Sequence, residues 1–273
     1  MSSPPPRRAA LVAAVALTAA LLLLVIAVGA LPGTGPVPAR AAADSTGPAL
    51  RATGALPVAP PFTGCQFKGD SRPRRHGPAS GRRIALTFDD GPSPYTPKIL
   101  DILRKERVPA TFFVQGDHVA GSEAVLRRML AEGHMIGSHS FTHPYLTRST
   151  TDIGREIRMT QDVIKAATGG FVPCLLRPPF GAVNQRVIDE LKAQRLANII
   201  WTVNPADYRN PGSAAIKRTI LAGTAPGAII IDHDGGGNRS QTVKAMPGVI
   251  KALKARGYRF VTVTDLLGLR TTG

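Results

Sequence analysis

Acidic residues are scarce in this 273-residue chain, which has 18 Asp and Glu against 34 Lys and Arg and a formal net charge of +16. Such a basic excess favours contact with anionic surfaces or polymers. Nucleic acid is the usual alternative partner, but the sequence carries no recognition motif for it and its start indicates export. An ordinary solvated basic surface would account for the charge as well.

Cysteine is nearly absent, since only Cys65 and Cys174 occur. Their spacing fits no pattern of zinc-binding cysteines, which excludes a cysteine zinc site. An oxidising compartment would permit a disulfide between them. The sequence does not show whether the two α-carbons come within reach, so a bridge and two free thiols both stay as alternatives.

Long hydrophobic runs are also absent, except at the start of the chain. Arg7 and Arg8 precede an apolar run from Ala9 to Leu31, and small residues follow it. This order predicts a secretory signal peptide in residues 1–43, with an uncleaved membrane anchor as the alternative. In both cases we expect the rest of the chain outside the cytoplasm, and any membrane contact only through an uncleaved N-terminal segment.

The remaining chain divides by composition. Residues 44–82 are rich in Pro, Gly and Ala and have no sustained period, which predicts a linker. Residues 83–273 are long enough for one domain with a core of its own.

Apolar, β-branched runs alternate with helical patterns after residue 83. Most runs are too continuously apolar to have a polar face, as expected of strands buried on both faces. The alternation predicts an α/β domain, either a parallel barrel or an open doubly wound sheet. The predicted strands are Ile84–Phe88, Thr111–Val114, Met135–Ser138, Leu175–Arg177, Asn198–Val203, Ala228–Asp232 and Arg259–Val263. The predicted helices are Thr96–Glu106, Glu123–Glu132, Asp152–Thr168, Gln185–Arg195, Ala214–Ala222 and Pro247–Arg256.

The placement of polar residues favours a distorted (β/α)7 barrel. Barrels gather reactive side chains from the ends of many strands at one mouth, whereas an open sheet concentrates them at its switch point. The polar residues at or just after predicted strand ends are Asp89, Asp90, His139, Arg177, Asp207 and His233.

Asp89 and Asp90 are adjacent carboxylates at the point where a strand runs into a Gly-Pro turn. A metal ion beside one of them would relieve their repulsion and leave the other free to act as a base. His139 and His143, four residues apart, would complete a ligand set with Asp90 that leaves positions open for water and substrate. Zinc suits this set, and cobalt, nickel or iron would also fit it. A solvated turn and surface histidines are the alternative interpretation.

Two further clusters could complete such a site. Arg177 begins the stiff Arg-Pro-Pro-Phe-Gly turn and could hold a carboxylate by paired hydrogen bonds. His233 ends a very apolar strand and would need a carboxylate partner, for which Asp207 is the candidate, to act as an acid. The glycine run 235–237 lacks the Lys of a phosphate-binding loop and predicts a turn that lets the backbone approach a ligand closely.

Taken together, these clusters resemble the NodB-homology polysaccharide deacetylases, carbohydrate esterase family 4, over about residues 84–267. The resemblance implies a catalytic base at Asp89 and metal ligands at Asp90, His139 and His143. It further implies that Arg177 holds the base, that the Phe180 N–H binds the oxyanion, and that Asp207 tunes the acid His233. The family's usual sugar-groove Trp is replaced by Tyr208 and its usual Leu by Ile231, whereas Asp232 stands where an apolar residue is usual.

The resemblance also implies the chemistry, which is metal-dependent hydrolysis of N-acetyl groups on a polymer of N-acetylglucosamine. We expect peptidoglycan first, because a basic exported chain should stay at an anionic cell wall; chitin-type oligomers come second and acetylxylan third. A non-catalytic glycan-binding module on the same fold and a hydrolase of phosphate esters are the rivals from other classes.

Overall fold

The computed structural model of this chain describes residues 63–272. The signal or anchor predicted in residues 1–43 and the first part of the predicted linker lie outside the described residues. Within residues 63–272, none of the helices combines the length and the apolar character needed to cross a bilayer.

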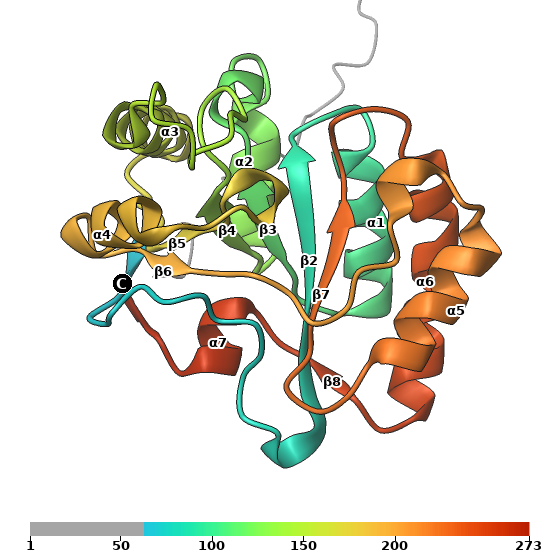
Figure 1. The fold of residues 1–273 in the computed structure, drawn as a ribbon. Coiled ribbons are helices and arrows are strands. Elements are labelled where there is room, and N and C mark those ends of the chain that lie inside the picture. Colours follow the sequence, from blue (N-terminus) through green and yellow to red (C-terminus); the bar gives the residue numbers. More distant parts are fainter. Residues whose placement is uncertain (1–62, 273) are drawn as a thin grey trace, which may run out of the picture. The chain divides into compact units, whose positions relative to one another are not determined.

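A parallel sheet forms the centre of the domain (Figure 1). Its strands run in the order β6-β5-β4-β3-β2-β7, and β8 also pairs with β2. All of these pairings are parallel, which confirms the α/β prediction. The strands are β2 (Arg83–Gly91), β3 (Thr111–Val114), β4 (Met135–Ser138), β5 (Leu175–Leu176), β6 (Ala197–Asn198), β7 (Ile229–His233) and β8 (Arg259–Phe260).

Helices connect successive strands, as parallel pairing requires. In Figure 1, α5 and α6 lie side by side near β7, with α1 next to α6, and α2, α3 and α4 lie beside β3 to β6. The helices are α1 (Thr96–Glu106), α2 (Glu123–Ala131), α3 (Ile153–Thr168), α4 (Gln185–Ala193), α5 (Ser213–Gly223), α6 (Ser240–Ala255) and α7 (Val263–Leu267). Short 3-10 turns lie at Ser80–Arg82, Gly116–His118, Pro179–Gly181 and Asp207–Arg209.

The central strand β2 explains why the site forms where it does. Its residues from Ile84 to Asp89 are all buried, as the continuous apolar run predicted. Arg83 begins the strand and Asp89 and Asp90 lie near its end, so the carboxylates project where β3 and β7 also end. Carboxyl ends of parallel strands meet at one edge of a sheet, and this edge carries the polar residues.

The helix predicted at residues 152–168 shows how local signals set element ends. The Asp152 side chain accepts a hydrogen bond from the Arg155 N–H and so caps α3. Gly169 ends the helix with a left-handed φ of 76°, which glycine adopts without steric penalty.

Three predicted strands are shorter than expected. The strand predicted as Leu175–Arg177 ends at Leu176, and the one predicted as Arg259–Val263 ends at Phe260, with Val263 beginning the unpredicted helix α7.

Of the segment predicted as Asn198–Val203, only Asn198 belongs to β6, and single parallel bridges follow from Ile199 to Arg74 and from Val203 to Ile230. The reason is that the Arg177 guanidinium donates to the carbonyls of Ile199 (3.2 Å) and Ile200 (3.4 Å), so these groups do not build a regular ladder. Among the described residues, the segment after β6 therefore meets β7 at one bridge, between Val203 and Ile230, and not along a continuous ladder.

Residues 63–82, which we assigned to the linker, pack on the domain. β1 (Gly64–Gln66) pairs antiparallel with β9 (Arg270–Thr272), and Cys65 forms a disulfide with Cys174 across a Cα–Cα distance of 5.2 Å. The buried Ser71 hydroxyl donates to the Leu196 carbonyl. These contacts make residues 63–82 part of the domain, which therefore begins before the predicted start at Arg83.

The helix predicted to begin at Pro247 begins instead at Ser240. An interior proline lacks the N–H that would bond four residues back and its ring crowds the carbonyl there, although its fixed φ is compatible with a helix. The added first half buries Thr242, Ala245 and Met246, so packing outweighs the local penalty of Pro247.

Candidate functional site

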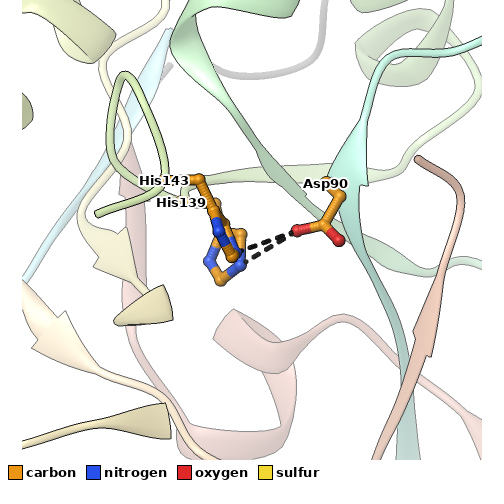
Figure 2. A group of neighbouring side chains, drawn as sticks. All are labelled: Asp90, His139 and His143. Atoms are coloured by element: carbon orange, nitrogen blue, oxygen red, sulfur yellow. Dashed lines mark ion pairs between the residues drawn. The ribbon is translucent and has the colours of Figure 1, made fainter. Parts of the chain in front are cut away.

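A carboxylate and two imidazoles meet at the carboxyl edge of the sheet (Figure 2). Asp90 lies at the end of β2, and His139 and His143 lie in the loop after β4. Oδ1 of Asp90 is 3.3 Å from Nε2 of His139 and 3.4 Å from Nε2 of His143. One possible ligand atom from each residue lies within 4.8 Å of the others. The three predicted metal ligands therefore share one site.

The hydrogen bonding of His139 suits a cation at this position. Its Nδ1 lies 2.7 Å from the Arg177 carbonyl, which can only accept, so Nδ1 carries a proton and, in the neutral imidazole, Nε2 presents a lone pair. That lone pair faces Oδ1 of Asp90, which is buried and has no hydrogen-bond partner among the described residues. Two facing acceptors with no proton between them fit a metal ion, which would satisfy both.

Asp89 points to the same pocket but is held by a different partner. Nη1 of the fully buried Arg177 donates to Oδ1 of Asp89 at 2.6 Å and to the Thr87 hydroxyl at 2.8 Å. The guanidinium also lies 4.1 Å from the centre of the Phe113 ring. Burial lowers the pKa of Arg177, while the Asp89 charge opposes this. Arg177 thus fixes Asp89 with its side chain and His139 with its carbonyl.

His233 and Asp207 form the second charged pair of the site. Nδ1 of His233 donates to Oδ1 of Asp207 at 2.6 Å, and the His233 N–H donates to Oδ2 at 2.9 Å. The Thr242 hydroxyl of α6 donates to the same oxygen at 2.7 Å. Burial alone would lower the pKa of His233, but the hydrogen bond and charge of Asp207 outweigh it and raise that pKa. The imidazole is therefore kept protonated to higher pH than an ordinary histidine.

These groups border one pocket of about 600 Å³. Arg177 and Asp207 lie behind its wall and orient the residues that line it. The predicted site residues that line the pocket are Asp89, Asp90, His139, His143, Phe180, Tyr208, Ile231 and His233. Every residue predicted for the site is thus either in the wall of this pocket or in direct contact with a residue that is.

Comparison with known proteins agrees with this geometry. The sequence model of the family described as polysaccharide deacetylase matches residues 76–199. A chitooligosaccharide deacetylase from Bradyrhizobium sp. is 40% identical over 207 residues, and the match covers 71% of this chain and 94% of that protein. The chain belongs to the polysaccharide deacetylase family. The resemblance noted in the sequence is thereby confirmed.

Two further members extend the comparison. The peptidoglycan-N-acetylglucosamine deacetylase PgdA of Listeria monocytogenes is 41% identical over 191 residues, covering 69% of this chain. The matched part is 40% of the length of PgdA, so this chain spans about two fifths of that relative. The crystal structure of the Bc1960 peptidoglycan N-acetylglucosamine deacetylase superposes with a TM-score of 0.70 at 31% identity and covers 74% of this chain and 95% of that one.

This polysaccharide deacetylase domain carries an aromatic rim around the pocket. Phe180 is 53% exposed, stacks on the Tyr145 ring at 4.0 Å and meets the His143 ring edge-on at 4.6 Å. Phe180 has a left-handed φ of 61°, inside the rigid turn that begins at Arg177. Tyr208, which replaces the usual Trp, is 44% exposed and meets the His233 ring edge-on. Flat rings at both sides of a pocket are suited to sugar faces.

Asp232, the unusual residue of the last motif, is fully buried in β7. Neither of its carboxylate oxygens has a hydrogen-bond partner among the described residues. Burial, followed by the charges of Asp207 and Asp89, raises the pKa of Asp232 well above its ordinary value. It therefore lies behind the site as an unpaired carboxyl group, and nothing in the structure shows a chemical use for it.

The sequence missed a set of residues that fix Asp90. The Asp90 backbone has a left-handed φ of 69°, and its carbonyl accepts a hydrogen bond from Nδ1 of His118 at 2.8 Å. A Cβ on Gly235 or Gly236 would clash with Asp90. Arg239, buried beside the pocket, donates to the carbonyls of both glycines. The glycine run did predict a close backbone approach, and among the described residues it approaches Asp90, with Gly236 also lining the pocket.

Glu156 of α3 was also missed. Its carboxylate accepts hydrogen bonds from the N–H groups of Phe141 and Thr142, both at 2.8 Å, and from the Thr142 hydroxyl at 2.9 Å. These residues lie between His139 and His143, so Glu156 fixes the loop that carries both imidazoles. Nothing in its sequence surroundings distinguishes it from an ordinary surface glutamate of an amphipathic helix.

Proposed function

We propose that this chain is a metal-dependent hydrolase that removes N-acetyl groups from an N-acetylglucosamine-containing glycan. The observation that carries the proposal is the position of the Asp90, His139 and His143 triangle. The triangle shares one pocket with a carboxylate fixed by an arginine and an imidazole fixed by a carboxylate. Amide hydrolysis needs such a combination of Lewis acid, base and acid in one pocket.

Asp90, His139 and His143 would hold the metal ion. When bound, a divalent ion supplies Lewis-acid polarisation of the acetyl carbonyl and makes water more acidic. We propose zinc, because two imidazoles and one carboxylate match the donor set of catalytic zinc sites. Cobalt, nickel and iron share these ligand preferences and are the alternatives.

Asp89 acts as the base in this mechanism. Its Oδ2 lies 3.9 Å from Nε2 of His139, so the carboxylate borders the metal-ligand triangle. Arg177 occupies the other oxygen and keeps the carboxylate from turning away. Asp89 therefore takes the proton of the attacking water, and such a general base contributes about 100- to 10,000-fold.

Phe180 and His233 act on the other two centres of the reaction. The Phe180 N–H, placed by its rigid turn, donates to the developing oxyanion, and one such donor contributes on the order of 3 kcal/mol. His233, protonated through Asp207, gives its proton to the leaving amine. The products are free acetate and a glucosamine unit.

Peptidoglycan is the substrate that we propose first. The peptidoglycan-directed relatives and the strongly basic chain both support it, because bacterial walls are anionic. The chitooligosaccharide deacetylase relative supports a neutral oligomer as the second candidate, and acetylxylan is the third. Tyr208 and Ile231 would contact the sugar from the pocket wall.

The remaining proposals concern the whole chain. We propose that residues 1–43 export the protein or anchor it, so that it works outside the cell or at the wall. We also propose that the curved sheet is a distorted (β/α)7 barrel, which the bridge between Val203 and Ile230 supports.

Acetate release from peptidoglycan, chitin oligomers and acetylxylan tests the proposed function. Each substrate is incubated with metal-free and zinc-loaded protein, with an aryl phosphate as a control for phosphatase activity. We expect acetate only from the loaded protein and no phosphate release. Glycan binding without any acetate release under both conditions would instead identify a non-catalytic glycan-binding module.

A further inference from the structure

The segment that forms α5 and α6 carries no exposed acid. Between residues 208 and 264 the acidic residues are Asp232 and Asp234, and both are buried. The same segment presents several exposed or half-buried cations, which are Arg209, Lys217, Arg218, Lys244, Lys251, Lys254, Arg256 and Arg259. These cations are therefore not balanced by any exposed acid of the same segment, and five of them, Lys217, Arg218, Lys244, Lys251 and Lys254, lie on α5 and α6.

Three lysines gather at the seam between the two helices. Lys217 of α5 reaches over α6, where its Nζ would lie 3.2 Å from a Cβ on Gly248. Lys244 and Lys251 are four residues before and three residues after Gly248, so both project from the same face of α6. We call Lys217, Lys244 and Lys251 the lysine seam.

The lysine seam is not neutralised within the described part of the chain. Its lysines form no ion pair there, whereas Lys254, one helical turn further, pairs with Glu106 of α1. Arg256 donates to the Leu221 carbonyl at the end of α5, which gives that arginine an ordinary capping role. Like charges held together without acids destabilise a fold, so the seam is a candidate for binding an anion.

The surroundings of the seam point to a polymer and not to a bilayer. Peripheral membrane helices insert large apolar side chains, but the large apolar side chains exposed in residues 63–272 are Tyr145, Val172, Phe180 and Tyr208, none of them in α5 or α6. The 16 residues of α6 give the face a length of about 24 Å, enough for several repeats of an extended chain. Lysine ammonium groups are compact point charges that suit phosphate oxygens.

We propose that the α5–α6 face binds a linear polyanion of the phosphodiester class through the lysine seam. The helix that carries Lys244 and Lys251 begins beside the pocket, because Arg239, just before α6, lines the pocket wall and the buried Thr242, on the opposite face of α6, bonds Asp207. A bound polymer would hold the protein where neighbouring glycan strands reach Asp89. The effect on turnover rests on the proposed deacetylase function, whereas the binding itself does not.

The test compares two charge-matched triple variants. One removes the seam by Lys217→Gln, Lys244→Gln and Lys251→Gln. The control removes three exposed lysines from elsewhere by Lys68→Gln, Lys165→Gln and Lys192→Gln. Binding to a synthetic poly(glycerol phosphate) is measured at several salt concentrations, with vesicles rich in anionic lipid as a second probe.

We expect the seam variant to bind poly(glycerol phosphate) on the order of 100-fold more weakly, with a flatter salt dependence, if each lysine acts as at an anionic surface. The control should lose less than about threefold, since its charges are distant and screened. Equal losses in both variants would overturn the proposal, because net charge alone would then explain binding. Binding of the wild-type protein to vesicles but not to the polymer would overturn it as well.

Acetate release separates this proposal from the proposed function. On a soluble neutral chitooligosaccharide, both variants should keep the wild-type kcat/KM, and on phosphate-polymer-bearing walls only the seam variant should slow. If the wild-type protein releases no acetate from any substrate, the deacetylase function fails. The binding comparison still decides whether the seam holds a polyanion.

Discussion

The two halves of the site differ in whether the protein itself satisfies their polar atoms. In the half around Asp90, a buried carboxylate oxygen and an imidazole lone pair face each other without a proton between them. In the half around His233, both carboxylate oxygens of Asp207 accept hydrogen bonds, from the imidazole, a backbone N–H and the Thr242 hydroxyl.

This difference teaches that the two halves depend on different conditions. The Asp90 half needs a cation to satisfy its acceptors. The left-handed backbone of Asp90 is fixed by the His118 hydrogen bond and by the close approach of Gly236, which Arg239 holds. The His233 half needs only a proton on the imidazole, and Asp207 favours that proton by raising the pKa of His233. Metal removal should therefore act first on the Asp90 half, and a rise in pH above the His233 pKa should act on the His233 half.

His139→Ala should have the largest effect on activity. It removes one metal ligand and leaves Asp90 and His143 too few to hold an ion, so acetate release should fall by about four orders of magnitude or more. Metal content by elemental analysis should fall in parallel. A variant that still carries one equivalent of zinc would break the comparison.

Asp89→Asn should come next, with a fall in kcat of about 1,000- to 10,000-fold from loss of the base. The amide keeps the shape of the carboxylate, and Asp89 is not among the metal ligands, so zinc content should stay at the wild-type level. Full turnover in this variant would show that another group takes the proton from water.

Asp207→Asn should act on pH dependence, with a loss of about 10- to 100-fold at neutral pH. His233 must be protonated to act as an acid, so activity is present below its pKa and lost above it. Without Asp207, burial lowers that pKa, and the alkaline limb of the kcat/KM profile should move to lower pH. An unmoved limb, with zinc bound, would assign that limb to a group other than His233.

Asp232→Val should have the smallest effect on turnover, within about threefold, and should stabilise the fold by about 1–3 kcal/mol near pH 8. The folded-state pKa of Asp232 is raised, so the contribution of this one group to stability is fully present below the ordinary carboxyl pKa and is lost as pH rises through the raised value. Urea unfolding at pH 4, 6 and 8 should show the gain growing with pH. A loss of stability at pH 8 would mean that Asp232 has a partner.

The sequence predicted the elements whose signals are local. The apolar run before Asp89 and the pattern of α3 between Asp152 and Gly169 both form where periodicity and capping indicate. Residues at strand ends were predicted as site residues because parallel strands bring such ends together, and the structure places them around one pocket.

The parts that could not be predicted depend on contacts distant in sequence. Residues 63–82 have no periodicity, and their place is set by pairing with β9 and by the Cys65–Cys174 bridge. The segment after Asn198 is irregular because Arg177 takes its carbonyls. Glu156 has a role only because α3 lies beside the loop of the two histidines.

The ribbon of β1 and β9 has a practical consequence for protein engineering. Gly64 lies opposite Thr272, so the polypeptide enters and leaves the described domain at adjacent points. A short peptide could join these points, and new ends could be opened in a surface loop without cutting the core. The fold is thus suited to circular permutation and to insertion as a module within another protein.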